Sequence, residues 1–119
     1  MRHWMAAAAL LLTLGPAMGQ DYPTKPINII VPAAAGGPTD AISRVTAGAM
    51  SKVLGQQITI ENMGGAGGTL ATTRAARAEP DGYTLLIYHV GLATAQTLYR
   101  NLPFDTRTAF APAHAAGML

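Results

Sequence analysis

Short apolar runs alternate along this chain with segments of helical spacing. Three runs that are rich in β-branched or aromatic residues are typical of buried strands: 25–32, 57–62 and 83–88. Segments with the periodicity or composition of helices follow them: 41–54, 69–78 and 92–99. The resulting order β-α-β-α-β-α, with short connections, predicts an α/β fold in which helices cover the faces of a parallel sheet.

The first helical segment, 41–54, has an apolar side that we expect to pack against the sheet. The members of this side recur at helical spacing: Ile42, Val45, Ala49, Val53 and Leu54. Polar residues such as Arg44 fall elsewhere on the helix, and Gly55 stands where a C-cap glycine belongs. The pattern therefore predicts both the rotation of this helix and its end.

Three loops follow the predicted strands, and two of them are rich in glycine. Their sequences are AAAGGPTD (33–40), MGGAGG (63–68) and HVGLAT (89–94). In an open α/β sheet, ligands bind beyond the carboxyl ends of the strands, where these loops would meet. Glu61 and Asn62 end the second strand, where they can pack against the neighbouring loop. Sequence and topology therefore both predict that a ligand binds at the edge of the sheet where these loops meet.

The glycine loops are suited to hold a small anion through backbone groups. Glycine lets a backbone approach a ligand closely and adopt positive φ, while the first amides of a helix lack an internal partner and favour negative charge. Five glycines would shape such a cradle: Gly36, Gly37, Gly65, Gly67 and Gly68. Thr39 and Thr69 can donate hydroxyl hydrogen bonds or cap the helices. The alternative is that the glycines serve tight turns only.

Several polar residues near these loops admit two interpretations. Asp40 either stabilises the helix dipole, which we favour, or binds a donor group of the ligand through water. Arg74 and Arg77 are expected to be solvated rather than to clamp a ligand. His89 is expected to end a strand rather than to contact a ligand, and Tyr88 to lie at the edge of the core.

The loops do not match the patterns of nucleotide, catalytic or metal sites. A P-loop needs Lys and then Ser or Thr after its glycines, which GGAGGTLA lacks, and a G-x-G-x-x-G pattern starting at Gly65 would need glycine at Leu70. The sequence offers no nucleophile–base pair and no suitably spaced acids, so we expect no catalytic residue. Without cysteine or a histidine cluster we expect no metal or cofactor. Without a basic charge run we expect no nucleic-acid partner, so binding is favoured over catalysis.

Residues 1–19, MRHWMAAAALLLTLGPAMG, have the layout of a secretory signal peptide. Arg2 precedes a predominantly apolar stretch, 5–14, that is too short to span a bilayer. Small residues precede Gln20, so we expect cleavage before Gln20 and export to the periplasm. A buried N-terminal helix is the alternative. The remaining residues, 20–119, suffice for one small domain with a core of its own.

Five segments together resemble a known family. In chain order from Tyr22 to about Pro112 they are YPTKPINIIVP, GGPTDAISRV, LGQQITIENMGGAGGTLA, EPDGYTLLI and LPFDTRTAFAP. This succession is similar to the N-terminal part of the tripartite tricarboxylate transporter receptors, also called Bug or TctC-type receptors. These are periplasmic substrate-binding proteins rather than enzymes.

The resemblance implies a two-lobed, type II-like periplasmic binding protein whose lobes close on a small organic acid. The acid is commonly a di- or tricarboxylate, and the receptor, expected to be a monomer, delivers it to a membrane permease. Residues 20–119 would form part of the N-terminal lobe, with the second lobe missing from a truncated chain. A small secreted α/β domain that binds nucleotides or acts as an enzyme, and a non-functional remnant, are the alternatives.

The resemblance also implies which residues bind the ligand. In the family, the ligand lies between the loop after the first strand and the glycine loop after the second, held by amides, hydroxyls and bridging waters. The corresponding residues here are Gly36, Gly37, Thr39, Asp40, Gly65, Ala66, Gly67 and Gly68, with 89–94 adding further contacts. Ala33 and Ala35 replace the family's usual aromatic and proline, while Pro38 and Met63 replace a small polar residue and an arginine. These departures bear on the identity of the ligand, not on the fold.

Overall fold

The structure, a computed structural model, describes residues 21–113. The predicted signal peptide at 1–19 lies outside the described residues. Within them, no helix is long and apolar enough to cross a membrane.

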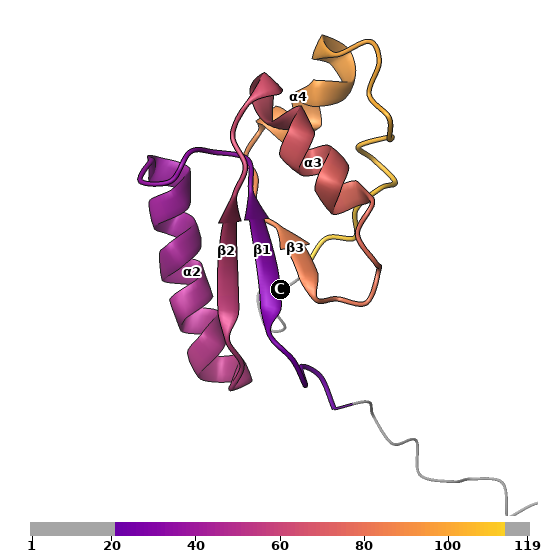
Figure 1. Cartoon of the computed structure of the whole chain (residues 1–119). Helices are drawn as coiled ribbons and strands as arrows, with labels where there is room; N and C mark the ends of the chain where they lie inside the picture. Colours follow the sequence, from indigo (N-terminus) through magenta and orange to yellow (C-terminus); the bar gives the residue numbers. More distant parts are fainter. Residues whose placement is uncertain (1–20, 114–119) are drawn as a thin grey trace, which may run out of the picture.

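The described chain folds in the predicted order of strands and helices (Figure 1). The elements are β1 Ile27–Val31, α2 Pro38–Leu54, β2 Ile58–Asn62, the 3-10 turn η1 Ala66–Gly68, α3 Thr69–Ala76, β3 Thr84–Leu86 and α4 Gly91–Leu98. Helix α2 begins three residues earlier than the sequence pattern predicts, because Pro38 fits the first turn of a helix, where its missing N–H is not needed. Gly55 ends α2 in the left-handed conformation, as predicted for a C-cap glycine.

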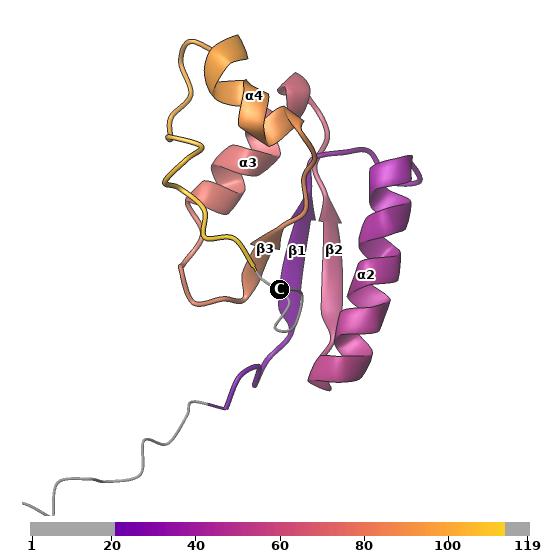
Figure 2. The same cartoon turned by 180° about the vertical axis from the view of Figure 1, so that it is seen from behind.

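The three strands form a parallel sheet in the order β2-β1-β3. Ile29 of the central strand β1 pairs with Ile60 of β2 and with Leu85 of β3. Since all three strands run the same way, their carboxyl ends meet at one edge, and the loops that follow them gather there. Figures 1 and 2 show α2 along one side of the sheet, α3 on the other side, and α4 beyond the strand ends.

The core lies between α2 and the sheet. Ile29, Val31 and Ala47 are buried at its centre. Partly buried residues surround them: Ala33, Met50, Ile58, Ile60, Leu85 and Ile87. Because fully burying an isoleucine or valine side chain contributes about 1.5–3 kcal/mol, Ile29 and Val31 supply much of the stabilisation of this small core.

The predicted rotation of α2 is wrong. Its buried residues are Asp40, Ser43 and Ala47, while Ile42, Val45 and Val53 are 64%, 75% and 84% exposed. The helix carries apolar residues on two opposite sides, and the side with the small residues faces the sheet. Ser43 is satisfied there because its hydroxyl donates to the Thr39 carbonyl at 2.7 Å. Ala47 and Met50 of this side pack against the core, so this side meets the sheet and the β-branched side does not.

The other face of the sheet carries a polar chain of contacts that ends on α3. Asn28 of β1 donates its amide N–H to Glu61 at 2.8 Å, and the Thr59 hydroxyl lies 3.0 Å from the Asn28 amide oxygen. Arg74 of α3 forms an ion pair with Glu61 at 2.9 Å. Arg74 is therefore paired with a carboxylate of the protein, whereas the sequence predicted a simply solvated side chain.

Candidate functional site

The loops after β1 and β2 lie against each other at the carboxyl edge of the sheet. We call residues 32–37 the first loop, 63–68 the second loop and 87–90 the third loop. The Met63 N–H donates to the Val31 carbonyl at 2.9 Å. A Cβ atom added at Gly64 would lie 3.4 Å from the Ala34 nitrogen and 3.6 Å from the Ala33 carbonyl carbon. The two loops therefore make backbone-to-backbone contact, as expected for loops that share one edge.

Asp40 holds the first loop from within the protein. Its carboxylate is only 3% exposed, and one oxygen, Oδ2, accepts hydrogen bonds from the Gly36 N–H at 2.8 Å and from Arg44 Nε at 2.9 Å. The other oxygen, Oδ1, accepts from Asn62 Nδ2 at 2.9 Å. These bonds, that from Arg44 foremost, lower the pKa of Asp40 from 3.8 to about 2. Asp40 is therefore ionised at neutral pH, and its charge is compensated by protein groups.

Asn62, at the end of β2, connects the second strand to the first loop. Its Nδ2 donates to the Ala33 carbonyl at 3.3 Å as well as to Asp40, and its Oδ1 accepts from Arg44 Nη2 at 3.2 Å. The expectation that this strand end packs against the neighbouring loop is confirmed for Asn62. Glu61 instead pairs with Asn28 and Arg74 on the opposite face of the sheet.

The second loop follows a backbone path that favours glycine at nearly every step. Four consecutive residues have positive φ: Gly65 at 110°, Ala66 at 47°, Gly67 at 60° and Gly68 at 84°. The turn is closed by the Gly68 N–H, which donates to the Gly65 carbonyl at 2.9 Å. The Thr69 hydroxyl donates to the Ala66 carbonyl at 2.8 Å. Glycine suits these positions because positive φ strains any residue that carries a Cβ atom.

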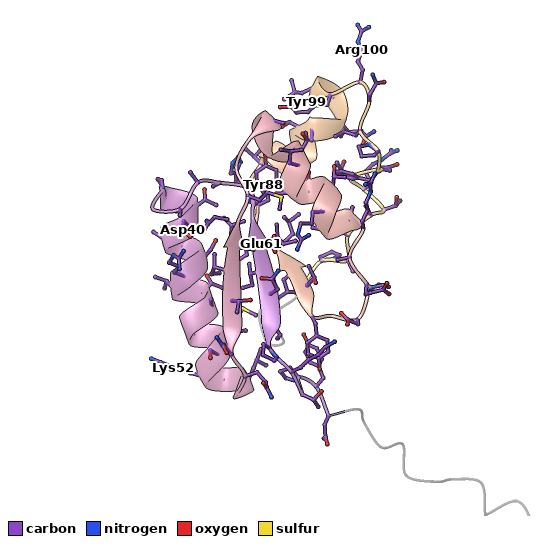
Figure 3. The ribbon with its side chains drawn as sticks, in the orientation of Figure 1. Asp40, Lys52, Glu61, Tyr88, Tyr99 and Arg100 are labelled. Atoms are coloured by element: carbon purple, nitrogen blue, oxygen red, sulfur yellow. The ribbon has the colours of Figure 1, made fainter. Side chains whose placement is uncertain are left out.

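Two tyrosines cover the end of the second loop. The Tyr88 hydroxyl, from the third loop, donates to the Gly67 carbonyl at 2.7 Å, and the ring of Tyr99 lies beside the Cα of Gly67. Burial is the main cause that raises the pKa of Tyr88 above its ordinary value, and the neighbouring Tyr99 is the second. Figure 3 shows Tyr88 near the strand ends and Tyr99 beside α4. The sequence pattern missed this role, because the spacing of 21 residues between Gly67 and Tyr88 carries no local signal.

His89 belongs to the third loop and supports its entry into α4. Its ring lies against that of Tyr88, with centroids 4.5 Å apart. Its Nδ1 accepts a hydrogen bond from the Gly91 N–H at 3.1 Å. The expectation that His89 ends a strand is wrong, because β3 already ends at Leu86 and His89 lies in the loop beyond it.

The residues predicted to bind a ligand divide into two groups in the structure. Asp40 and Gly68 are buried, while the remaining six are exposed or half-buried: Gly36, Gly37, Thr39, Gly65, Ala66 and Gly67. Within residues 21–113, the Thr39 hydroxyl and the N–H groups of Gly64 and Gly65 form no hydrogen bond. Gly64 was not among the predicted site residues. These three groups are donors that remain available to an acceptor from outside the described residues, which suits an anion.

Two surface hollows lie away from the first loop. One, of about 340 Å³, lies between α3 and 99–103, and the other, of about 700 Å³, lies between α3 and the amino ends of β1 and β3. In the part of the chain that the structure describes, no group of three or more His, Cys, Asp or Glu residues is placed to hold a metal ion.

The sequence matches a known protein family. Residues 42–115 match the family described as "Tripartite tricarboxylate transporter family receptor". A protein of Agrobacterium vitis, the "UPF0065 protein in the TAR-I ttuE-ttuC' intergenic region", is 54% identical over 107 residues, which are 87% of this chain and 31% of the relative. The chain thus spans about a third of the length of the curated relatives that it matches.

Solved structures of periplasmic binding proteins match the described fold. BugD superposes with a TM-score of 0.74 and 50% identity, over 76% of this chain and 30% of that chain. MatC from Rhodopseudomonas palustris with bound malate gives a TM-score of 0.72 and 46% identity, over 76% and 31%. Another R. palustris protein, solved with adipate, gives a TM-score of 0.69 and 34% identity, over 73% of this chain and 29% of that chain. The neighbours are two-lobed, and the described residues correspond to a part of them.

Proposed function

The chain belongs to the tripartite tricarboxylate transporter receptor family, and from this membership we propose that it binds a small dicarboxylate at the edge formed by its first and second loops. The family consists of solute-binding receptors, not enzymes. Two structural neighbours were solved with malate and with adipate, which both carry two carboxylates. This common chemistry supports the choice of ligand class.

The observation that carries the proposal is the set of exposed donors at the contact of the two loops. Gly64, which touches the first loop, and its neighbour Gly65 have N–H groups without an acceptor in the described residues. The first turn of α2, with Thr39, adds helix amides that lack partners inside the helix, and a hydroxyl. A carboxylate would accept hydrogen bonds from such groups and be favoured by the helix dipole.

The negative charge of Asp40 does not argue against an anion site here. Its carboxylate is buried and paired with Arg44 at 2.9 Å, so the pair is neutral as a unit. Its hydrogen bond to the Gly36 N–H fixes the first loop at the point where α2 begins. In this proposal Asp40 positions the loop, while Gly36, Gly37 and Thr39 face the ligand.

The wider role follows from the family and forms part of the same proposal. Residues 1–19 would direct export of the chain and then be cleaved off. The mature chain would act as a monomeric receptor in the periplasm and deliver its ligand to a membrane permease. Within a two-lobed receptor, the described residues would supply one wall of the cleft, and closure of the other lobe would bury the ligand. A single exposed wall is expected to bind weakly.

Calorimetric titration of the purified protein tests the proposal. We expect L-malate and adipate to bind with dissociation constants of about 1 mM, equivalent to roughly 4 kcal/mol. The uncharged diamide of malate, which matches its shape without its charge, is the control and is expected not to bind. The proposal would be contradicted if the diamide bound as well as malate does. It would also be contradicted if neither acid bound up to about 50 mM, which is some fiftyfold above the expected dissociation constant.

A further inference from the structure

The four glycines of the second loop have two kinds of surroundings. A Cβ atom at Gly65 would meet only the Leu70 side chain, at 3.6 Å, which is ordinary contact. At Gly67 a Cβ atom would collide with the Tyr99 hydroxyl, and at Gly68 it would lie 2.7 Å from the Tyr88 Cζ. Gly67 and Gly68 therefore lie against the protein's own tyrosines, whereas Gly65 is open and Gly64 contacts only the backbone of the first loop.

Tyr88 contacts two structural elements besides its own. Its hydroxyl donates to the Gly67 carbonyl at 2.7 Å, while its ring covers Gly68. A Cβ atom at Gly91, the first residue of α4, would lie 2.7 Å from the Tyr88 hydroxyl. The ring of His89, tilted by 53° to that of Tyr88, packs against the tyrosine from a further side. Tyr88 thus joins the second loop to the third loop and to the start of α4.

We propose that Tyr88 is a positioning residue for the carboxylate site: its hydrogen bond to the Gly67 carbonyl fixes the second loop so that the N–H groups of Gly64 and Gly65 are held ready for the ligand. The inference rests on the proposed function of this edge. Positive φ at four consecutive residues leaves the loop without regular backbone pairing, so it depends on a few specific bonds. The bond from Tyr88 and the turn bond between Gly68 and Gly65 are two of these.

The chain offers a matched control for this role. Tyr99 lies against the same loop residue, Gly67, but within residues 21–113 its hydroxyl forms no hydrogen bond. Tyr88→Phe removes the hydrogen bond and keeps the ring, while Tyr99→Phe removes only a hydroxyl from the same place. Any difference between the two variants therefore reports on the bond to the Gly67 carbonyl.

Two measurements on the wild type and both variants test the inference. Calorimetry with L-malate is expected to give about tenfold weaker binding for Tyr88→Phe, because one net hydrogen bond orders the loop, and unchanged binding for Tyr99→Phe. Backbone ¹⁵N relaxation is expected to show increased mobility at 64–67 in Tyr88→Phe alone, with the amide signals of β1 unchanged as evidence of an intact fold. Mobility distinguishes a positioning role from a general loss of stability.

The outcomes separate this inference from the proposed function. Wild-type binding of malate by Tyr88→Phe, or an unchanged loop in its relaxation data, would overturn the role of Tyr88 and leave the carboxylate site standing. Absence of malate binding in the wild type would overturn the proposed function, and the relaxation data would then decide alone whether Tyr88 orders the loop. A Tyr88→Phe variant without an ordered β1 would contradict the inference as well, because its effect would be global.

Discussion

The first and second loops look alike in sequence, yet the protein holds them by different means. In the first loop, Gly36 has a φ of +84°, open space surrounds it, and its N–H is held by the buried charge of Asp40. In the second loop, Gly68 has the same φ of +84° but lies beneath Tyr88 and Pro32. A buried charge holds the first loop, whereas tyrosine packing and the hydrogen bond from Tyr88 hold the second, so glycine content alone does not reveal how a loop is held.

The largest expected effect comes from Gly68→Ala. The new Cβ atom would combine left-handed strain with a 2.7 Å approach to Tyr88 Cζ and a 3.1 Å approach to the Pro32 Cβ. We expect destabilisation of about 3 kcal/mol, of which roughly 1–2 is conformational strain and the rest overpacking. Urea unfolding of the purified variant measures this change.

Gly36→Ala is the matched control for that substitution, since both glycines share a φ of +84° and no atom lies within 4 Å of a Cβ at Gly36. The control isolates the backbone strain, for which we expect about 1 kcal/mol. Equal losses in the two variants would show that the tyrosine does not constrain the second loop, and the contrast between the loops would disappear.

Asn62→Ala is expected to have the next largest effect. It removes the two hydrogen bonds that Asn62 Nδ2 donates to Ala33 and Asp40, and the bond that its Oδ1 accepts from Arg44. We expect a loss of about 1–3 kcal/mol in unfolding free energy. Thr59→Val, which removes a more exposed hydroxyl from the same strand, is the control, with an expected change within about 0.5 kcal/mol. If both variants unfold alike, Asn62 does not brace the first loop.

The first loop should also respond to acid, because its anchor is a carboxylate. The pKa of Asp40 is lowered from 3.8 to about 2, so the folded state favours the charged form. The stabilisation is therefore complete above the ordinary pKa and is lost as the pH falls from about 4 through about 2. Thermal unfolding of Asp40→Asn between pH 2 and pH 6 should show a weaker dependence on pH than the wild type does.

Asp81 also has a lowered pKa, so Asp81→Asn serves as the control for that experiment. Its carboxylate is held mainly by the Tyr83 N–H, far from the first loop. We expect the acid sensitivity of the first-loop amide signals to remain in Asp81→Asn and to vanish in Asp40→Asn. Retention of that sensitivity in Asp40→Asn would refute the role assigned to the buried charge.

The smallest expected effect is that of a substitution on the exposed side of α2, the helix whose rotation directs Asp40 inward. Val53 is 84% exposed, so Val53→Thr should change the unfolding free energy by no more than about 0.5 kcal/mol. Ala47→Val, on the buried side of the same helix, should destabilise by about 1–3 kcal/mol through overpacking. The reverse order of effects would restore the rotation that the sequence pattern predicts.

The sequence was sufficient for the existence of three parallel strands and for the converging loops, because runs such as 27–31 and the glycines after them are local signals, although β3 ends two residues earlier than the predicted 83–88. It was insufficient for the rotation of α2, since two opposite sides of that helix are apolar and only tertiary packing selects between them. Asn62 could be placed at the loop contact from its position at a strand end. Tyr88 could not, because its partner, Gly67, is distant in sequence and the contact depends on how α4 follows β3.

The most direct test of the carboxylate site is a titration of the ¹⁵N-labelled protein with L-malate, followed through backbone amide signals. We expect saturable shifts concentrated at 36–40 and 64–65, with little change along α2 beyond its first turn. Shifts confined to the hollow between α3 and 99–103, or spread evenly over the charged surface, would show that the anion binds elsewhere. That result would contradict the claim that the two loops form the binding edge.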